Sequence, residues 1–169
     1  GVPVVVGAGF SPGLTCLLAR HAAAGFDQVD EVHVARSGTG GPACARAHHR
    51  ALAGTAIDWR DGGWQRRRAG SGRELCWFPD PVSAKDCYRG ALAEPLLLVP
   101  ALPGVRRVTA RLAASRRDRA LAPFPVLVPP PTEGGLGAIR VALRGELDGA
   151  RSSVVLGALD RPAVAASGV

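Results

Sequence analysis

A glycine-rich turn near the start of the chain contains the residues whose types and spacing best suit ligand chemistry. Three valines at residues 4–6 lead into the segment Gly7-Ala8-Gly9-Phe10-Ser11-Pro12-Gly13. Glycines let a backbone approach a phosphate closely, and the N-terminus of a following helix favours negative charge. Pro12 stands where the G-x-G-x-x-G fingerprint has its third glycine, so two interpretations stay open: a phosphate contact, or a tight turn between a strand and a helix.

A second candidate is the pair Arg36-Ser37, which closes the next expected strand. An arginine at this position could hold the 2′-phosphate of NADP. The planar fork of a guanidinium also suits a substrate carboxylate, which it binds through two parallel hydrogen bonds.

The histidines and cysteines are candidates for metal ligands and for acid–base groups. Cys44 and His48 are four residues apart on an expected helix, and with His49 or His21 they could bind zinc. No second pair in the sequence has ligand spacing, so we expect no metal site, and Cys44 is interpreted as a small buried thiol. His48 or His49 could serve as a general base, but a solvent-exposed pair is the simpler interpretation.

Hydrophobic periodicity and turn residues predict the elements that position these groups. Expected helices begin at Ser11-Pro12, at Pro42 and at the capping-box pattern Ser83-x-x-Asp86, the last being stopped by Pro95. Strands are expected at residues 2–6, 29–35 and 107–112, the last with its arginines on a wet face. Two hairpins are expected, one joining residues 64–69 to 73–78 around Gly70-Ser71-Gly72 and one joining 139–143 to 152–159 at Asp148-Gly149.

This order of elements predicts an α+β fold: a mixed, largely antiparallel sheet with helices on one face. We expect the sheet to be preceded by a terminal strand of a Rossmann-type sheet. The domain division is therefore residues 1–10 as the last strand and turn of a Rossmann-type domain, and residues 11–169 as an α+β domain truncated at its C-terminus. Residues 116–137 are expected to form a long connection, such as a lid or an arm that crosses between subunits, and a last helix is expected after Pro162.

Several segments resemble the saccharopine dehydrogenase family. The stretch from Gly7 to Thr15 is similar to that family's G-x-x-P-G-[LIV]-[ST] motif, which opens the second domain after a Rossmann domain. The loop Ser37-Gly38-Thr39-Gly40-Gly41-Pro42 is similar to the family's glycine-proline loop. Residues 77–81 resemble its strand ending in F-P-x-P, and residues 145–166 its final hairpin and helix.

The resemblance implies a division of labour between two halves of an NAD(P)-dependent oxidoreductase. The cofactor would be bound mainly by an N-terminal Rossmann half that this sequence lacks, with Gly9, Phe10, Ser11, Pro12 and Gly13 near the nicotinamide. The α+β half would bind an amino-acid-like substrate, with Gly40, Gly41 and Pro42 at the substrate site, and would form a homodimer. Hydride transfer at a C–N or C=N bond is the implied reaction, and no catalytic acid or base is identified.

Composition limits the remaining classes of function. The chain has 169 residues, 47% of them apolar, and a net charge of +7 that is almost entirely arginine. The arginines are dispersed and aromatic residues make up only 5%, so we expect no nucleic-acid binding. No apolar run is long enough for a membrane span, and four scattered cysteines without a C-x-x-C pair indicate free thiols in the cytoplasm.

Two alternatives stay open at this point. One is a non-catalytic interaction domain of the same fold. The other is a self-contained NADP-binding Rossmann domain that uses Gly7 to Gly13 directly, and it predicts a parallel sheet. Because the chain has no methionine and opens on an apolar run, we expect it to be a piece of a longer protein.

Overall fold

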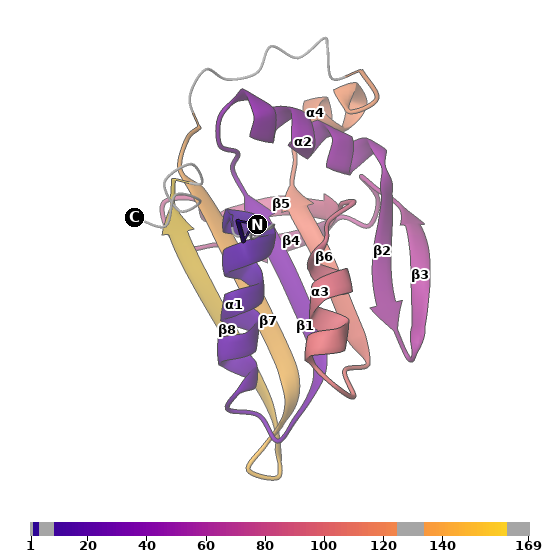
Figure 1. Cartoon of the computed structure of the whole chain (residues 1–169). Helices are drawn as coiled ribbons and strands as arrows, with labels where there is room; N and C mark the ends of the chain where they lie inside the picture. The colour runs from indigo at the N-terminus through magenta and orange to yellow at the C-terminus, as the bar shows by residue number, and fades with distance from the viewer. Residues whose placement is uncertain (1, 4–8, 125–133, 162–169) are drawn as a thin grey trace.

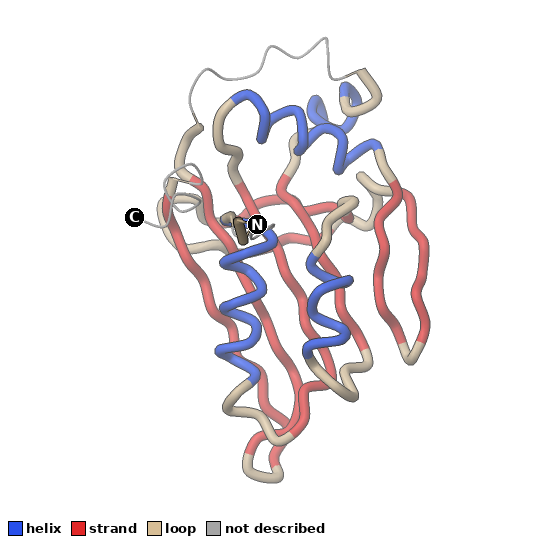
Figure 2. The backbone as a smooth tube through the Cα atoms, in the orientation of Figure 1, coloured by secondary structure: helices blue, strands red, loops and turns tan. Residues whose placement is uncertain are grey.

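The computed structural model describes residues 2–3, 9–124 and 134–161. These residues form four α-helices, a short π-turn and eight strands (Figure 2). In chain order they are the π-turn Phe10–Leu14, α1 (Thr15–Ala23), β1 (Gln28–Ser37), α2 (Pro42–Ala53), β2 (Thr55–Arg60), β3 (Gly63–Arg68), β4 (Glu74–Trp77), β5 (Ala84–Arg89), α3 (Glu94–Ala101), β6 (Arg107–Ala113), α4 (Arg116–Leu121), β7 (Gly137–Leu147) and β8 (Ala150–Asp160).

All eight strands belong to one sheet, whose main path runs β3-β2-β6-β1-β7-β8. The pair β1 and β6 is parallel, and every other described pair is antiparallel. The outer side of β6 is shared, because β2 pairs with its first residues and β5 with its last. Helices α1 and α3 cover one face of the sheet, whereas α2 and α4 lie at one end of it (Figure 1). The predicted α+β fold with a largely antiparallel sheet is confirmed, and the parallel sheet of the Rossmann alternative is not found among the described residues.

The core follows the two-residue alternation of the central strand β1. Val32 and Val34 point to the helix side, where they pack with Leu98 of α3, Val108 of β6 and other buried residues. Ala35 points to the opposite side, where the β4–β5 pair covers it with Cys76, Cys87 and Phe78. The sheet is therefore buried on both faces only at the end that β4 and β5 cover.

Three predictions of local structure are wrong. The strand at 64–69 pairs with β2, not with 73–78, because Asp61-Gly62 forms the turn with positive φ angles of 46° and 83°. Residues 84–89 are the strand β5, not a helix, since they pair with both β4 and β6. Pro95 opens α3 instead of stopping a helix; proline fits the first turn, where its missing N–H costs no hydrogen bond.

The strand β6 is also more buried than its sequence indicates. Its five inner residues are all buried, including Thr109 and Arg111, which were expected on a wet face. The reason is that the β4–β5 pair and the loop before it cover this side. Arg111 Nε lies 2.7 Å from Glu74 Oε2, and its guanidinium donates to the carbonyl oxygen of Gly72.

Other predictions are confirmed or concern segments outside the described residues. The strands at 29–35, 139–143 and 152–159 and the helix at 42–52 are present, with the turn at Asp148-Gly149. Within the expected connection 116–137, α4 occupies the first residues, and 125–133 lie outside the described residues. Most of the expected strand at 2–6, and the helix after Pro162, also lie outside the described residues, so the domain division at residue 10 stays a prediction.

The packing of α3 on the sheet yields a test within a single helix. Leu98 is 1% exposed in the core, whereas Leu97 is 49% exposed beside it. We expect Leu98→Ala to lower the free energy of unfolding by about 2–5 kcal/mol, because it leaves a cavity under the helix. Leu97→Ala is the matched control and should change it by about 0.5 kcal/mol or less. Urea denaturation followed by circular dichroism measures both, and equal losses would contradict this packing.

Candidate functional site

The candidate site lies at the carboxyl ends of the parallel strands β1 and β6. Ligands of α/β sheets bind preferentially at this end of parallel strands. The loop that follows β1 leads into α2, and the residues that follow β6 lead into α4, so both helices lie at this end (Figure 1). A hydrogen bond joins the π-turn before α1 to Glu94, the first residue of α3.

A buried carboxylate ties the predicted cofactor turn to α3. The hydroxyl of Ser11 donates to Glu94 Oε1, and Thr15 Oγ1 lies 3.1 Å from the same oxygen and 2.9 Å from the carbonyl oxygen of Pro12. Glu94 is 1% exposed and stands in the first turn of α3, where the helix dipole favours negative charge. Its other oxygen, Oε2, is shielded from solvent and has no partner among the described residues.

Ser11 therefore has a different role from the predicted helix cap. Its backbone is extended, with φ −144° and ψ 122°, and α1 begins only at Thr15. Gly9 precedes the π-turn, Phe10 is buried, and Pro12 and Gly13 are partly buried within the turn. Burial, followed by the charge of Glu94, raises the pKa of the neighbouring Cys16 to about 11.

Arg36 is the main cation of the site. It follows Val32 and Val34 on the helix side of β1, opposite Leu112 of β6 and Ile139 of β7. Its Nε is shielded from solvent without a hydrogen-bond partner, and the guanidinium forms no ion pair with any described residue. Burial lowers the pKa of Arg36. The charge of Glu94 and, less strongly, that of Cys44 raise this pKa and offset part of the effect. The guanidinium thus feels the charge of Glu94 and of Cys44 in the first turn of α2.

The start of α2 supplies free N–H groups at the same end of the sheet as this cation. Gly41 caps the helix without a side-chain hydrogen bond, Pro42 stands in the first turn, and no acidic residue lies there. Gly38 has φ 83°, and a Cβ on it would lie 2.6 Å from the Cα of Gly137, so the loop can pack against β7 only as glycine. Gly40, in the same loop, is buried. Arg36 and the unfilled N-terminus of α2 together suit a carboxylate or another anion.

The two predicted sets of site residues thus lie at the same end of the sheet. The turn from Gly9 to Gly13 is joined to Glu94, and the segment from Gly40 to Pro42 leads from the end of β1, which carries Arg36, into α2. Contact of either set with a cofactor or a substrate stays a prediction. Glu94 was missed from the sequence because Pro95 was interpreted as a helix stop; a Glu-Pro pair at a possible helix start was the available signal.

His48 and His49 lie on the inner side of α2, contrary to the expectation of a solvent-exposed pair. They are 8% and 6% exposed, with ring centroids 5.6 Å apart. They line a pocket of about 300 Å³ between α2, the loop after β1 and Asp118 of α4. The helix turns this face inward because it must cover the end of the sheet, and Cys44, expected to be buried, is exposed instead.

Other groups of the described residues do not extend the site. No three His, Cys, Asp or Glu side chains gather there as a set of metal ligands. Asp86 pairs with Arg73 at 2.9 Å instead of capping a helix. None of the described helices combines the length and the apolar character that a membrane crossing requires.

The buried His48 predicts a specific loss of stability in acid. Burial, then the charge of Arg36, lowers its pKa from 6.5 to about 4, against the opposing charge of Asp118. The unfolded chain therefore binds the proton more tightly, so stability that is present above about pH 6.5 is lost as the pH falls towards 4, by about 3 kcal/mol at most. His48→Asn should remove this part of the pH dependence in urea unfolding, and His21→Asn on the exposed face of α1 should not. Parallel pH profiles for the wild type and His48→Asn would contradict the burial of this ring.

Comparison with known proteins bears on the fold. No family model and no curated protein matches the sequence. Among solved structures, the chain is similar to apo saccharopine dehydrogenase (L-Glu forming) from Saccharomyces cerevisiae, with a TM-score of 0.59 and 12% sequence identity. The alignment covers 90% of this chain and 58% of that chain. At this identity the similarity shows the fold alone, so the resemblance is confirmed only as a structural relationship.

Proposed function

We propose that this chain is the substrate-side domain of an NAD(P)-dependent oxidoreductase that acts at a C–N or C=N bond of an amino-acid-like substrate. The observation that carries the proposal is that Arg36, whose shielded Nε has no hydrogen-bond partner, and the unfilled N-terminus of α2 both lie at the carboxyl end of β1. An α-amino acid presents a carboxylate, and a guanidinium and free helix N–H groups at one end of a sheet are both complementary to that group.

The fold supports the same proposal. The chain shares its fold with a saccharopine dehydrogenase, and its Gly7 to Thr15 segment resembles the family motif that opens the second domain. The described part of that segment lies one hydrogen bond away from Glu94, at the same end of the sheet as Arg36. A substrate bound at this end of the sheet would face any domain that packs against the turn.

The described residues do not fit a complete cofactor site. The hydroxyl of Ser11 is already bonded to Glu94, Pro12 has no N–H to donate, and the sheet is not doubly wound and parallel. A bound NAD(P) would supply or accept the hydride. In the proposed division of labour a Rossmann-type domain holds it, while this chain binds the substrate carboxylate and helps to exclude water.

The proposal extends to partners and compartment. We propose a homodimer, no nucleic-acid ligand and a cytoplasmic location. The four cysteines form no disulfide, as a reducing compartment requires, and β3 places its three arginines on an open edge without interleaved aromatic residues. The alternative function, a non-catalytic interaction domain, would keep the fold without using the anion site.

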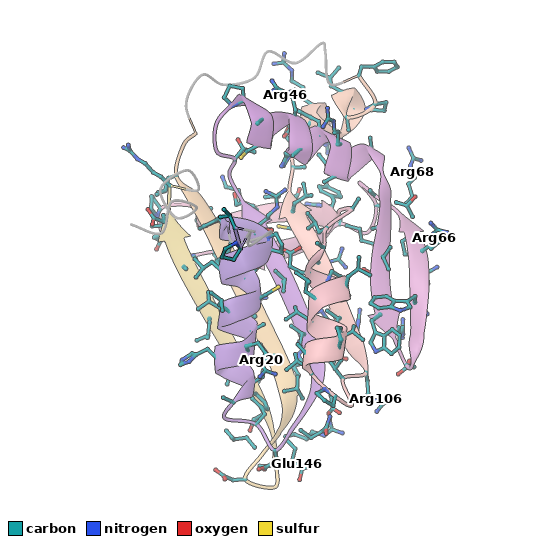
Figure 3. All side chains as sticks on the ribbon, in the orientation of Figure 1. Arg20, Arg46, Arg66, Arg68, Arg106 and Glu146 are labelled. Atoms are coloured by element: carbon teal, nitrogen blue, oxygen red, sulfur yellow. The ribbon has the colours of Figure 1, made fainter. Side chains whose placement is uncertain are left out.

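The role of Arg36 can be tested with a simple carboxylate. We expect glutarate and L-glutamate to shift the amide resonances of the first turn of α2 in NMR titrations. Arg36→Ala should weaken binding by about 10- to 100-fold, because it removes a charged bidentate contact, and Arg36→Lys should weaken it less. Arg46→Ala, on the exposed side of the same helix (Figure 3), is the matched control and should leave affinity unchanged. Equal affinity in the Arg36 and Arg46 variants would contradict the site.

Cofactor binding separates the proposal from its alternatives. Calorimetric titration of this chain with NADH and NADPH should give no binding, whereas a protein with a Rossmann-type domain upstream of it should bind one of them. Binding by this chain alone, abolished by Gly9→Asp, would show that Gly7 to Gly13 is a phosphate cradle and that the domain assignment is wrong. Absence of binding in both proteins would favour the non-catalytic interaction domain.

A further inference from the structure

A pocket of about 380 Å³ lies at the C-terminal end of α2, between the turn that follows β3 and the helix α4. Three arginines line it: Arg68, the last residue of β3, and Arg116 and Arg119 of α4. Of the described residues around this cavity, none is an Asp or a Glu. Figure 3 shows Arg68 near the end of α2 and far from Arg106. We call this cavity the arginine pocket.

The three guanidiniums form no ion pair with residues 2–3, 9–124 or 134–161. A second charged pocket, around Arg106, provides the contrast, because each of its five arginines lies within 4 Å of an acidic side chain. Those pairs join Arg60 and Arg106 to Asp61, Arg107 and Arg144 to Glu31, and Arg151 to Asp30. Arginines that gather without such partners can still bind an anionic ligand.

The arginines are positioned by contacts that leave their N–H donors free. Arg116 and Arg119 are three residues apart, so they lie on the same side of α4. The guanidinium carbon of Arg119 lies 4.2 Å from the ring centroid of the buried Tyr88, which orients the group without using a donor. The turn after Arg68 is held by Gly70, which has φ 71° and donates its N–H to a carbonyl oxygen of β5. This order in the absence of a ligand lowers the entropic cost of binding.

The carbonyl end of α2 offers these arginines another role, since cations stabilise the C-terminus of a helix. However, no hydrogen bond within the described part of the chain joins any of the three guanidiniums to the last turn of α2. Two carbonyl oxygens of that turn, those of Arg50 and Ala51, already accept the backbone N–H groups of Gly54 and Ala91. Three positive charges also exceed the partial charge of a helix end by about sixfold. The helix end alone therefore does not balance the charge of the pocket.

We propose that the arginine pocket binds the phosphate group of a small phosphomonoester. A phosphomonoester carries about two negative charges and three acceptor oxygens, so it matches three guanidiniums better than a singly charged carboxylate does. The volume of about 380 Å³ lies within the range of small-molecule pockets, and apolar residues such as Leu52, Ala122 and Pro123 complete the lining beside an organic group. This site lies at the opposite end of α2 from Gly41, and it does not depend on the proposed activity.

Calorimetric titration of the full chain with phenyl phosphate tests the site. We expect one phenyl phosphate to bind per chain, and acetate to bind about 10-fold more weakly or less. Arg68→Gln should weaken phenyl phosphate binding by about 10- to 100-fold, because it removes a charged hydrogen-bond donor. Arg66→Gln makes the same change two residues earlier on β3, outside the pocket, and should leave affinity unchanged. Absence of binding, or equal losses in the two variants, would overturn the proposal.

Two further titrations separate the arginine pocket from other anion-binding surfaces. Arg36→Ala should leave the affinity for phenyl phosphate unchanged, and Arg68→Gln should leave the affinity for glutarate unchanged, so each site can fail without the other. Loss of phenyl phosphate binding in Arg36→Ala would place the phosphate at the candidate site and overturn the proposal. The dinucleotide TpT, whose phosphodiester carries a single charge, should bind about 10-fold more weakly than phenyl phosphate. Equal affinity for the two would indicate a nucleic-acid surface and overturn the assignment.

Discussion

The position of β1 between a parallel and an antiparallel neighbour is the constraint on which the rest of this structure depends. Successive side chains of a strand point to opposite faces, so the pairing of β1 with β6 and β7 decides where each of its residues lies. Val32 and Val34 form the core under the helices, and Arg36, two residues further, reaches the site at the strand's end. On the opposite face Glu31 lies 3.0 Å from His33 and within 4 Å of Arg107 and Arg144.

The site combines two groups that are costly to bury. A shielded guanidinium and a carboxylate with one unpartnered oxygen both lose hydration when the chain folds. The two hydroxyls that bind Glu94 and the first turn of α3 offset part of this cost for the carboxylate. Arg36 has no such partner among the described residues. Buried polar groups that keep unused hydrogen-bonding capacity are more typical of ligand sites than of structural cores.

Sequence patterns predicted the parts of the fold that local chemistry determines. Alternating apolar residues and an Asp-Gly turn identified β7 and β8, and glycine at both ends identified α2. The errors arose where tertiary pairing overrides local preference: Ser83 and Asp86 resemble a helix cap, but β5 is held between two strands. For the same reason the burial of Arg111 and His48 could not be predicted, since the segments that cover them are distant in sequence. The glycines and Arg36 were singled out because they have local signatures, whereas the Glu-Pro signature of Glu94 was interpreted as a helix stop.

The order of strands in the sheet determines when the site can form during folding. The central strand β1 pairs with β6 and β7, whose partner residues lie more than 70 and more than 100 positions further along the chain. Closing such long loops before their contacts are made is slow, and the hairpins β2–β3 and β7–β8 can form much earlier. While the chain is synthesised, β1 therefore waits for its neighbours until β7 has emerged. Arg36 and the start of α2 are brought into place only with this last pairing, so the proposed anion site would form together with the sheet and not before it.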